Sequence, residues 1–349
     1  MSHESKAKRF YANITSKEGD MKHRWERNIV VCFLVICLIT AVGVGCGKGA
    51  KGKVVITIGN ITDFTGAAST ALIPMTWAMG DVARYFNEGD LIPGAEIRIA
   101  SYDARYDPSR DIPGYDWVKA RGARVISTPL PSTANTLRPF AERDKIPLFT
   151  WGSNRSLVEP PGWVFCYNPP VSDMIQTLLE WISEEHWDYA NGIPRIGMAG
   201  WSESYQIEIK EGIGQYCQAH PDKFDYAGSY LVPMGASTWA GEIQKLKDCD
   251  YVCTPSTGTG LATFIRDYRD KGYTGTFIGS DAVPAYTRLL VDMCGWDRLD
   301  GTLTVHGMGW SSDQALLTEL AVDLANEYHP AEAEDLIMNT GWISAVHGD

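Results

Sequence analysis

The chain has 349 residues, of which 44% are hydrophobic and 21% charged, so it is long enough for two globular cores. Its formal net charge is -12 at pH 7. Binding to the phosphate backbone of a nucleic acid requires a basic surface that releases counterions, so this composition excludes nucleic acid as an expected partner.

A basic flank followed by an apolar run marks the N-terminal region as an export segment. Arg24 and Arg27 precede the uncharged residues 28–45, which end in small residues directly before Cys46. This layout is typical of a secretion signal, and the cysteine stands where lipoproteins carry their lipid. We expect residues 21–46 to be a lipoprotein signal with Cys46 as the lipidation site. A retained, uncleaved anchor is the alternative, because the run is long enough to span a membrane.

Residues 1–20 are polar and mixed in charge, and a more conventional signal begins at Met21. We expect Met21 to be the true start, which makes residues 1–20 an uncertain N-terminal extension. A cytoplasmic tail is the other interpretation. With either start, the rest of the chain is expected outside the cytoplasm.

The cysteines that follow the signal are odd in number and widely scattered. This pattern is not a disulfide framework, and their spacing does not match a zinc site. We expect buried free thiols, or at most one bridge, among Cys166, Cys217, Cys249, Cys253 and Cys294.

After a short linker, apolar strands alternate with amphipathic helices. Residues 54–59 are rich in β-branched side chains and end in glycine, which predicts a buried strand, and residues 70–87 have apolar side chains at helical spacing. By the same criteria we expect strands at 96–103, 124–128 and 146–151, and a second helix at 133–143. Such an alternation gives a parallel sheet with helices on both faces.

The alternation then begins again after residue 163. Residues 163–168 lead through two prolines into the next helix. We expect helices at 171–186, 205–220, 239–246 and 260–271, with strands at 195–201, 224–232, 250–256 and 275–281. Two such units in succession predict two lobes of similar architecture, with a ligand cleft between them.

Four segments, taken in order, resemble the type I periplasmic binding proteins, and specifically the branch of leucine/isoleucine/valine-binding receptors. They are GNITDFTGAAS at 59–69, IPLFTWGSN at 146–154, GWSESY at 200–205, and the block from Gly235 to Gly-Ser-Asp-Ala at 279–282. The last block carries the most specific part of the resemblance, which covers residue 54 to the end.

The resemblance implies an α/β fold in which two Rossmann-like lobes with parallel sheets are joined by a multi-strand hinge. The expected crossings lie near residues 168–170 and 302–306, and a helix within 311–330 then returns to the first lobe. We therefore expect lobe 1 to contain residues 54–167 plus 306–349, and lobe 2 to contain residues 168–305. A third crossing is expected beyond Asp349, so we expect a C-terminal segment to be missing.

Amino-acid recognition needs acceptors for an ammonium group and donors for a carboxylate. In a parallel sheet, such groups come from loops at the carboxyl ends of strands, where helix N-termini present free N–H groups. The loops that follow predicted strands offer Phe64, Thr65, Ser132, Thr133, Trp151, Gly152, Asn154, Thr257 and Asp281. The resemblance adds Trp201 and Tyr205 as an aromatic lid and assigns Asp281 to the ligand's ammonium.

Some of these residues also fit a purely structural role. Ser132 fits a helix N-cap, Trp151 fits a core residue as well as a pocket wall, and Asp281 fits a cap or turn. Residues 256–260 lack the lysine of a phosphate-binding loop, so Thr257 is interpreted as part of a helix entry.

The sequence has no Gly-x-Ser-x-Gly elbow, His-Glu-x-x-His helix or Walker loop, and its seven histidines are dispersed. We therefore expect a receptor without enzymatic activity, cofactor or metal. In this hypothesis it closes on an amino acid or a related small polar molecule and docks on the membrane permease of an ABC importer. Two alternatives stay open: a ligand-sensing ectodomain of a signalling receptor, and an amide hydrolase on the same scaffold.

Overall fold

The computed structural model describes residues 52–152 and 154–348. The predictions for residues 1–20, for the export segment and for Cys46 lie outside this part of the chain. Within it, no helix combines the length and the apolar character needed to cross a membrane.

By backbone contacts the chain divides into two units. Of the described residues, one unit contains 52–55 and 85–96. Its described residues are linked by a hydrogen bond of 2.8 Å from Val54 N to Gly94 O and by an ion pair between Lys53 and Asp90. The other unit contains residues 56–84 and all residues from 97 onward, and both sheets have their cores and loops in it.

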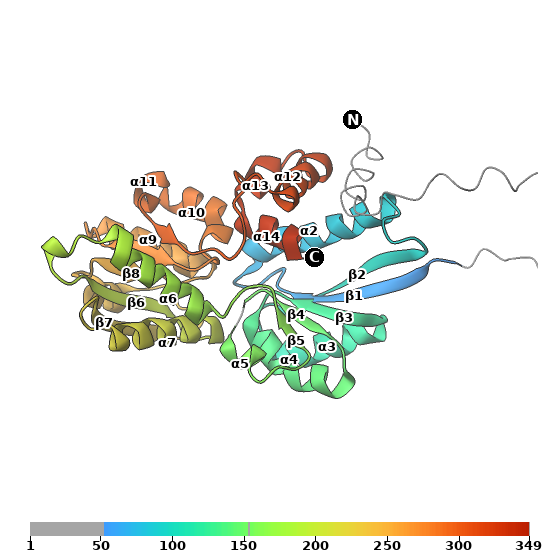
Figure 1. Ribbon diagram of the computed structural model, residues 1–349, viewed down its shortest axis with the longest axis horizontal. Helices are drawn as coiled ribbons and strands as arrows, with labels where there is room; N and C mark the ends of the chain where they lie inside the picture. Colours follow the sequence, from blue (N-terminus) through green and yellow to red (C-terminus); the bar gives the residue numbers. More distant parts are fainter. Residues whose placement is uncertain (1–51, 153, 349) are drawn as a thin grey trace, which may run out of the picture. The chain divides into compact units, whose positions relative to one another are not determined.

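The first sheet has five strands in the order β2-β1-β3-β4-β5 (Figure 1). The strands are β1 (Val54–Thr62), β2 (Ala95–Asp103), β3 (Ala123–Thr128), β4 (Leu148–Thr150) and β5 (Val164–Cys166). The helices along this half of the chain are α2 (Ser69–Glu88), η2 (Pro108–Arg110), α3 (Asp111–Ala120), α4 (Pro131–Asp144) and α5 (Arg155–Val158). We call this sheet with its helices the first lobe.

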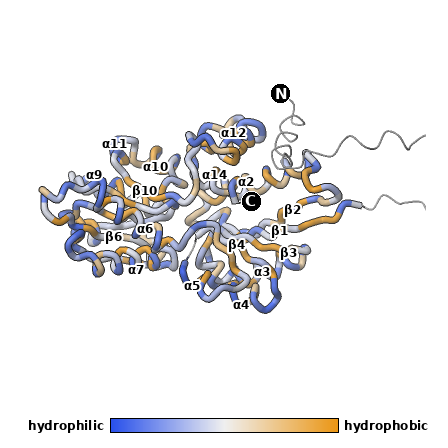
Figure 2. Tube along the Cα trace, viewed as in Figure 1, coloured by the Kyte–Doolittle hydropathy of each residue, from blue (hydrophilic) through white to orange (hydrophobic). Residues whose placement is uncertain are grey.

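Alternation along β1 sends successive side chains to opposite faces of the sheet. Ile61 joins the core under α3 and α4, together with Tyr115 and Leu137. On the other face, the Asn60 amide donates to the Thr76 hydroxyl of α2 at 3.3 Å. The first lobe is therefore a parallel sheet covered on both faces, as predicted. Figure 2 shows the hydrophobic colour of the buried strand β4.

The second sheet also has five strands, in the order β10-β9-β8-β6-β7, and all its paired strands are parallel. They are β6 (Arg195–Trp201), β7 (Asp225–Val232), β8 (Tyr251–Cys253), β9 (Thr276–Gly279) and β10 (Leu303–Thr304). The associated helices are α6 (Val171–Trp181), η3 (Ile182–His186), η4 (Tyr189–Asn191), α7 (Ser204–Ala219), α8 (Ala240–Leu246), α9 (Gly258–Asp270), η5 (Pro284–Tyr286), α10 (Thr287–Cys294) and α11 (Trp296–Leu299). This sheet and its helices form the second lobe.

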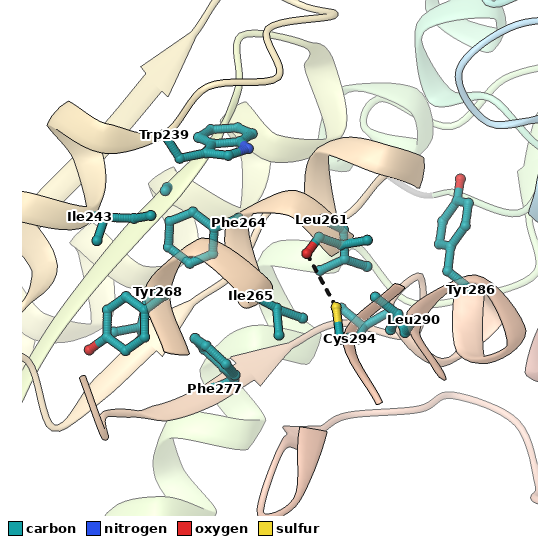
Figure 3. Packing of buried hydrophobic residues seen from close by; sticks show 14 of the residues in the cluster. Trp239, Ile243, Leu261, Phe264, Ile265, Tyr268, Phe277, Tyr286, Leu290 and Cys294 are labelled. Atoms are coloured by element: carbon teal, nitrogen blue, oxygen red, sulfur yellow. Dashed lines mark hydrogen bonds between the residues drawn. The ribbon is translucent and has the colours of Figure 1, made fainter. Parts of the chain in front are cut away.

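The two faces of the second sheet have separate cores. Ile196 and Met198 pack with α6 and α7, whereas the next residue, Ala199, packs with α8, α9 and α10. Figure 3 shows the latter core, with Trp239 beside Phe264 and with Cys294 donating a hydrogen bond to the Ala262 carbonyl. Burial of these aromatic side chains is a main source of the lobe's stability.

The chain enters the second lobe between β5 and α6 and leaves it after β10. It then forms α12 (Leu316–Tyr328), α13 (Ala333–Met338) and α14 (Thr340–Gly348). These helices pack against α2, because His329 stacks on Trp77 at 4.9 Å and lies 2.7 Å from the Asp81 carboxylate. Trp342 is fully buried and donates to the Ala321 carbonyl at 3.1 Å.

The five cysteines in the described part of the chain are free thiols, and four of them are buried. Burial raises the pKa of Cys253 to about 12, which keeps its thiol protonated.

Candidate functional site

A cavity of about 700 Å³, its open mouth included, lies where loops of both lobes meet. The loops that line it follow strands of both sheets, and the start of α14 adds a further wall. The first lobe contributes Ala68, Ala71, Leu72, Met75, Tyr106, Pro129, Leu130, Pro131, Trp151, Gly152 and Asn168. The second contributes Tyr205, Ser256, Thr257, Asp281, Ala282, Ala285, Tyr286 and His306, and α14 contributes Thr340, Gly341 and Ser344.

Asp281 follows β9 and is the only carboxylate among the described residues that line the cavity. Its Oδ2 accepts a hydrogen bond from the Asn168 amide at 2.7 Å, and its Oδ1 accepts one from the Tyr205 hydroxyl. Burial raises the pKa of Asp281, while the Tyr205 hydrogen bond and the nearby His306 oppose this rise. Asn168 and Tyr205 thereby hold the Asp281 carboxylate in place at the cavity.

Two polar atoms on the lining residues are buried without a hydrogen-bond partner. They are Oδ1 of Asn168 and Oγ1 of Thr340. A buried polar atom without a partner costs free energy, so such atoms mark places where a ligand group or water would bind favourably. The Asn168 atom belongs to the amide that also holds Asp281.

The helix N-termini around the cavity differ in how they are capped. Glu203 caps α7 by accepting from the N–H groups of Tyr205 and Gln206, both at 2.8 Å, and Asp63 accepts from the N–H of Ala68 at the entry to α2. The N-termini of α4 and α9 have no side-chain cap. Helix N-termini attract anions, so these two uncapped ends favour a negatively charged group in the cavity.

One wall of the cavity is apolar. Ala68, Leu72 and Leu130 are buried together, with Met75 packed against them. Trp151 is 7% exposed and packs on Tyr167, with 4.5 Å between the ring centroids, so it is both a wall of the cavity and part of a packed aromatic cluster. The cavity therefore has one apolar side and one polar side.

Five of the eleven predicted site residues line this cavity: Trp151, Gly152, Tyr205, Thr257 and Asp281. They come from loops up to 130 positions apart in the sequence, between Trp151 and Asp281. Their roles in binding remain predictions.

The other predicted residues do not line it. Phe64 N and the Thr65 hydroxyl both donate to Asp103, at 2.9 and 2.8 Å, which holds their loop against the end of β2. The Thr133 hydroxyl donates to the buried Asp111 at 2.9 Å. Asn154 donates to the Ser204 carbonyl at 3.1 Å, and the Trp201 indole donates to the Ala236 carbonyl at 2.9 Å.

Ser132 is not the N-cap that the sequence suggested. Helix α4 begins one residue earlier, at Pro131, with Leu130 in the cap position. Proline is favoured in the first turn, because its φ is already helical and its missing N–H would have no helical partner there. Ser132 therefore lies inside the first turn.

Several lining residues were not predicted as site residues. Asn168 and Tyr106 follow β5 and β2, Ser256 follows β8, and His306 follows β10. Each of them lies in a loop that follows the carboxyl end of a strand, where ligand-binding groups are expected, so the sequence contained a signal that could have identified them. Thr340 comes from a helix near the C-terminus, and no strand precedes it.

Residues 55–348 match a family model described as "Periplasmic binding protein". Among curated proteins, no sequence matches the chain significantly.

Solved structures with similar folds include one with bound valine and one in complex with benzoate. One is a branched chain amino acid ABC transporter protein from Thermus thermophilus with bound valine, with 17% identity and a TM-score of 0.71 over 84% of this chain and 76% of that one. Another is a leucine binding protein from Thermotoga maritima, with 15% identity and a TM-score of 0.67 over 83% and 80%. A third is a solute binding protein of an ABC transporter from R. palustris in complex with benzoate, with 14% identity and a TM-score of 0.67 over 82% and 78%. At these identities the similarity shows the fold.

Proposed function

The chain belongs to the type I periplasmic binding proteins, and we propose that it is the receptor of an ABC importer for an amino acid or a closely related ammonium-bearing solute. The single observation that carries the ligand class is the charge of the cavity. Among its described lining residues, Asp281 is the only carboxylate and none is Lys or Arg. A lone carboxylate in a partly desolvated site favours a cationic partner.

The ammonium group of such a solute has three N–H donors. Asp281 and the unpartnered Oδ1 of Asn168 are two acceptors for it, and the hydrogen bond between these side chains holds them side by side. This arrangement supports an ammonium that still carries N–H groups over a fully alkylated one.

A carboxylate on the same solute would find donors at the uncapped N-termini of α4 and α9. Thr257, the N-cap residue of α9, lines the cavity and adds a hydroxyl. The apolar wall around Leu72 and Leu130 then accommodates a hydrocarbon side chain. The bound valine of the Thermus thermophilus structure has these three parts, whereas the benzoate of the R. palustris structure lacks the ammonium.

Binding without turnover is part of the proposal. The Ser256 hydroxyl accepts a hydrogen bond from the Gln206 amide, and Nδ1 of His306 lies 2.6 Å from the Met308 carbonyl oxygen. Among the described residues no hydrogen bond joins the Ser256 hydroxyl to the His306 imidazole, and a hydrolytic nucleophile needs that contact with its base, so an amide hydrolase is the weaker candidate.

The same proposal includes delivery of the solute to a membrane permease and attachment of the receptor to the membrane. Lobe closure around the solute would present one surface to the permease. Lipidation at Cys46, or a retained N-terminal anchor, would keep the receptor near that permease. A ligand-sensing ectodomain would use the same cavity, and reconstitution with the permease separates the two roles.

A thermal-shift screen tests the ligand class. The panel contains the 20 L-amino acids, their deaminated carboxylic acids, the corresponding primary amines, and benzoate. We expect a stabilising shift with at least one amino acid that exceeds the shift with its deaminated partner, because a ligand that binds only the folded state raises its stability. A larger shift with benzoate or the deaminated acids than with any amino acid would contradict the proposal.

A further inference from the structure

We propose that the hydrogen bond between Tyr106 and Glu203 is a latch that stabilises the closed arrangement of the two lobes independently of any solute. The inference rests on the proposed function only in that the receptor works by lobe closure. Tyr106 follows β2 of the first lobe and Glu203 follows β6 of the second. Their side chains meet at 3.1 Å between the Tyr106 hydroxyl and Oε2 of Glu203, and both are 8% exposed.

The backbone that presents Tyr106 has an unusual conformation. Arg105 and Tyr106 both have positive φ, 58° and 53°, although neither is glycine. Two consecutive residues of this kind are energetically unfavourable and persist only where the surroundings hold them. Asp103 holds this turn by accepting from Arg105 N at 3.1 Å, and Arg110 donates to the Asp103 carbonyl at 3.0 and 2.9 Å. The strained turn thus directs Tyr106 toward the second lobe.

The acceptor is equally fixed. Glu203 caps helix α7 through two backbone N–H groups, so its carboxylate cannot turn away from the cleft without uncapping the helix. Burial raises the pKa of Glu203, and its three hydrogen bonds, one of them from Tyr106, oppose that rise. A hydroxyl that donates to a buried carboxylate is among the stronger hydrogen bonds in proteins.

Two neighbouring contacts show that the lobes are in close contact beside the latch. Asn154 of the first lobe donates to the Ser204 carbonyl, and Arg155 N donates to Glu208 of α7 at 3.2 Å. A Cβ atom at Gly258, at the start of α9, would lie 2.3 Å from the Ala67 carbonyl oxygen. Only glycine therefore allows α9 to approach the first lobe this closely.

The latch affects affinity without selecting the solute. A solute binds the closed state, so its apparent Kd equals the Kd of the closed state divided by the fraction of receptor that is already closed. A contact that favours closure before binding raises that fraction. Weakening the latch should then raise the apparent Kd of every solute by the same factor.

The test measures lobe separation in the full chain without any solute. Spin labels introduced as non-natural amino acids at the exposed positions Lys145 and Lys247 report the distance between the lobes, and native cysteines stay unlabelled. We compare Tyr106→Phe with Tyr216→Phe. Tyr216 donates to Glu180 at 2.8 Å, which is the same chemical pair within the second lobe alone.

We expect Tyr106→Phe to lower the ratio of closed to open receptor about tenfold and Tyr216→Phe to leave it unchanged, given the usual strength of hydrogen bonds to charged groups. Equal distance distributions for the wild type and Tyr106→Phe would overturn the proposal. A loss of L-leucine or L-valine affinity in Tyr106→Phe without any change in the distance distribution would also overturn it, because that result indicates direct contact with the solute.

A second pair of variants tests closure without touching the hydrogen bond. Gly258→Ala places a methyl group against Ala67, whereas Gly272→Ala introduces similar backbone strain, φ being 51° and 78°, with open space around the new atom. Only Gly258→Ala should shift the distances between the spin labels toward the open state. If both variants do so, or neither does, the close contact between Gly258 and Ala67 in the closed state is refuted. Because no solute is present, these results stand even if the proposed ligand class fails.

Discussion

Replacing Asp281 by asparagine tests the proposed ammonium site, because it removes the only carboxylate among the described lining residues and keeps the side-chain volume. The substituted amide can still accept from Tyr205, and a flip of the Asn168 amide would let its free oxygen accept the new N–H. The fold should therefore be preserved. What is lost is a charge-assisted hydrogen bond to the ligand's ammonium.

Hydrogen bonds to charged groups contribute about 1.5–3 kcal/mol, which corresponds to an increase in Kd of about 10- to 150-fold. Titration calorimetry with L-leucine or L-valine, whichever gives the larger thermal shift, measures this change. The matched control is Asp292→Asn, which removes an exposed carboxylate paired with Arg288 on the surface of α10. The deaminated analogue of the same amino acid provides the second comparison.

The wild type should bind the amino acid about 10- to 150-fold more tightly than the deaminated analogue. The Asp281→Asn variant should lose most of that preference. If the variant raises the Kd of both compounds by the same factor, Asp281 acts on the shape of the cavity and not on the ammonium. If it weakens neither, the site is elsewhere and the reasoning fails.

Three further predictions follow from the same structure. Burial raises the pKa of Asp281, so its carboxylate becomes protonated at a higher pH than an ordinary aspartate does. The affinity for an amino acid should therefore fall as the pH is lowered from neutrality. Calorimetry at several pH values should show a flatter profile for Asp281→Asn. Burial raises the pKa of Asp111 to about 6 from 3.8, so the fold loses stability as the pH rises from about 4 to about 6, and the loss is complete at pH 7. Asp111→Asn should therefore stabilise the fold by up to about 3 kcal/mol in urea unfolding at pH 7 and by nothing below pH 4, whereas an unchanged midpoint at pH 7 would contradict this. Trp239→Ala should destabilise by about 3–5 kcal/mol, because the indole is fully buried against Phe264, and a loss under 1 kcal/mol in the same assay would show that this core can collapse around the cavity.

The fold was predictable because its strands and helices have clear periodicity. Residues 195–201 were expected as a strand and form β6 over that range, and the helix expected at 70–87 is α2 (Ser69–Glu88). Both segments combine apolar runs or helical spacing with clear ends, which are the features that local sequence encodes best.

One helix was missed, and another differs in its C-terminal part, because the local sequence signals there are weak or contrary. Helix α3 (Asp111–Ala120) contains Pro113 and Gly114 near its start, which argue against a helix, yet Tyr115 and Val118 hold it on the sheet. The helix expected over 171–186 ends as an α-helix at Trp181 and continues as a π-helix through His186. Tertiary packing decides these cases, and it is not visible in a short window of sequence.

The candidate site was only partly predictable. The rule that sites form at strand carboxyl ends found Asp281 and Thr257 but could not show which side of each loop faces the cavity. Thr65 follows β1 but is held by Asp103, and Thr133 follows β3 but is held by Asp111. Those partners lie 38 and 22 positions away in the sequence, so the competition for each hydroxyl appears only in three dimensions.

A crystal structure of the chain grown with the amino acid that gives the largest thermal shift tests the central claim most directly. We predict electron density in the cavity between the two lobes, with the ammonium nitrogen within hydrogen-bonding distance, about 3 Å, of Asp281 and the carboxylate at the N-terminus of α4 or α9. An amino acid bound outside this cavity, or bound in it with its ammonium away from Asp281, would contradict the account.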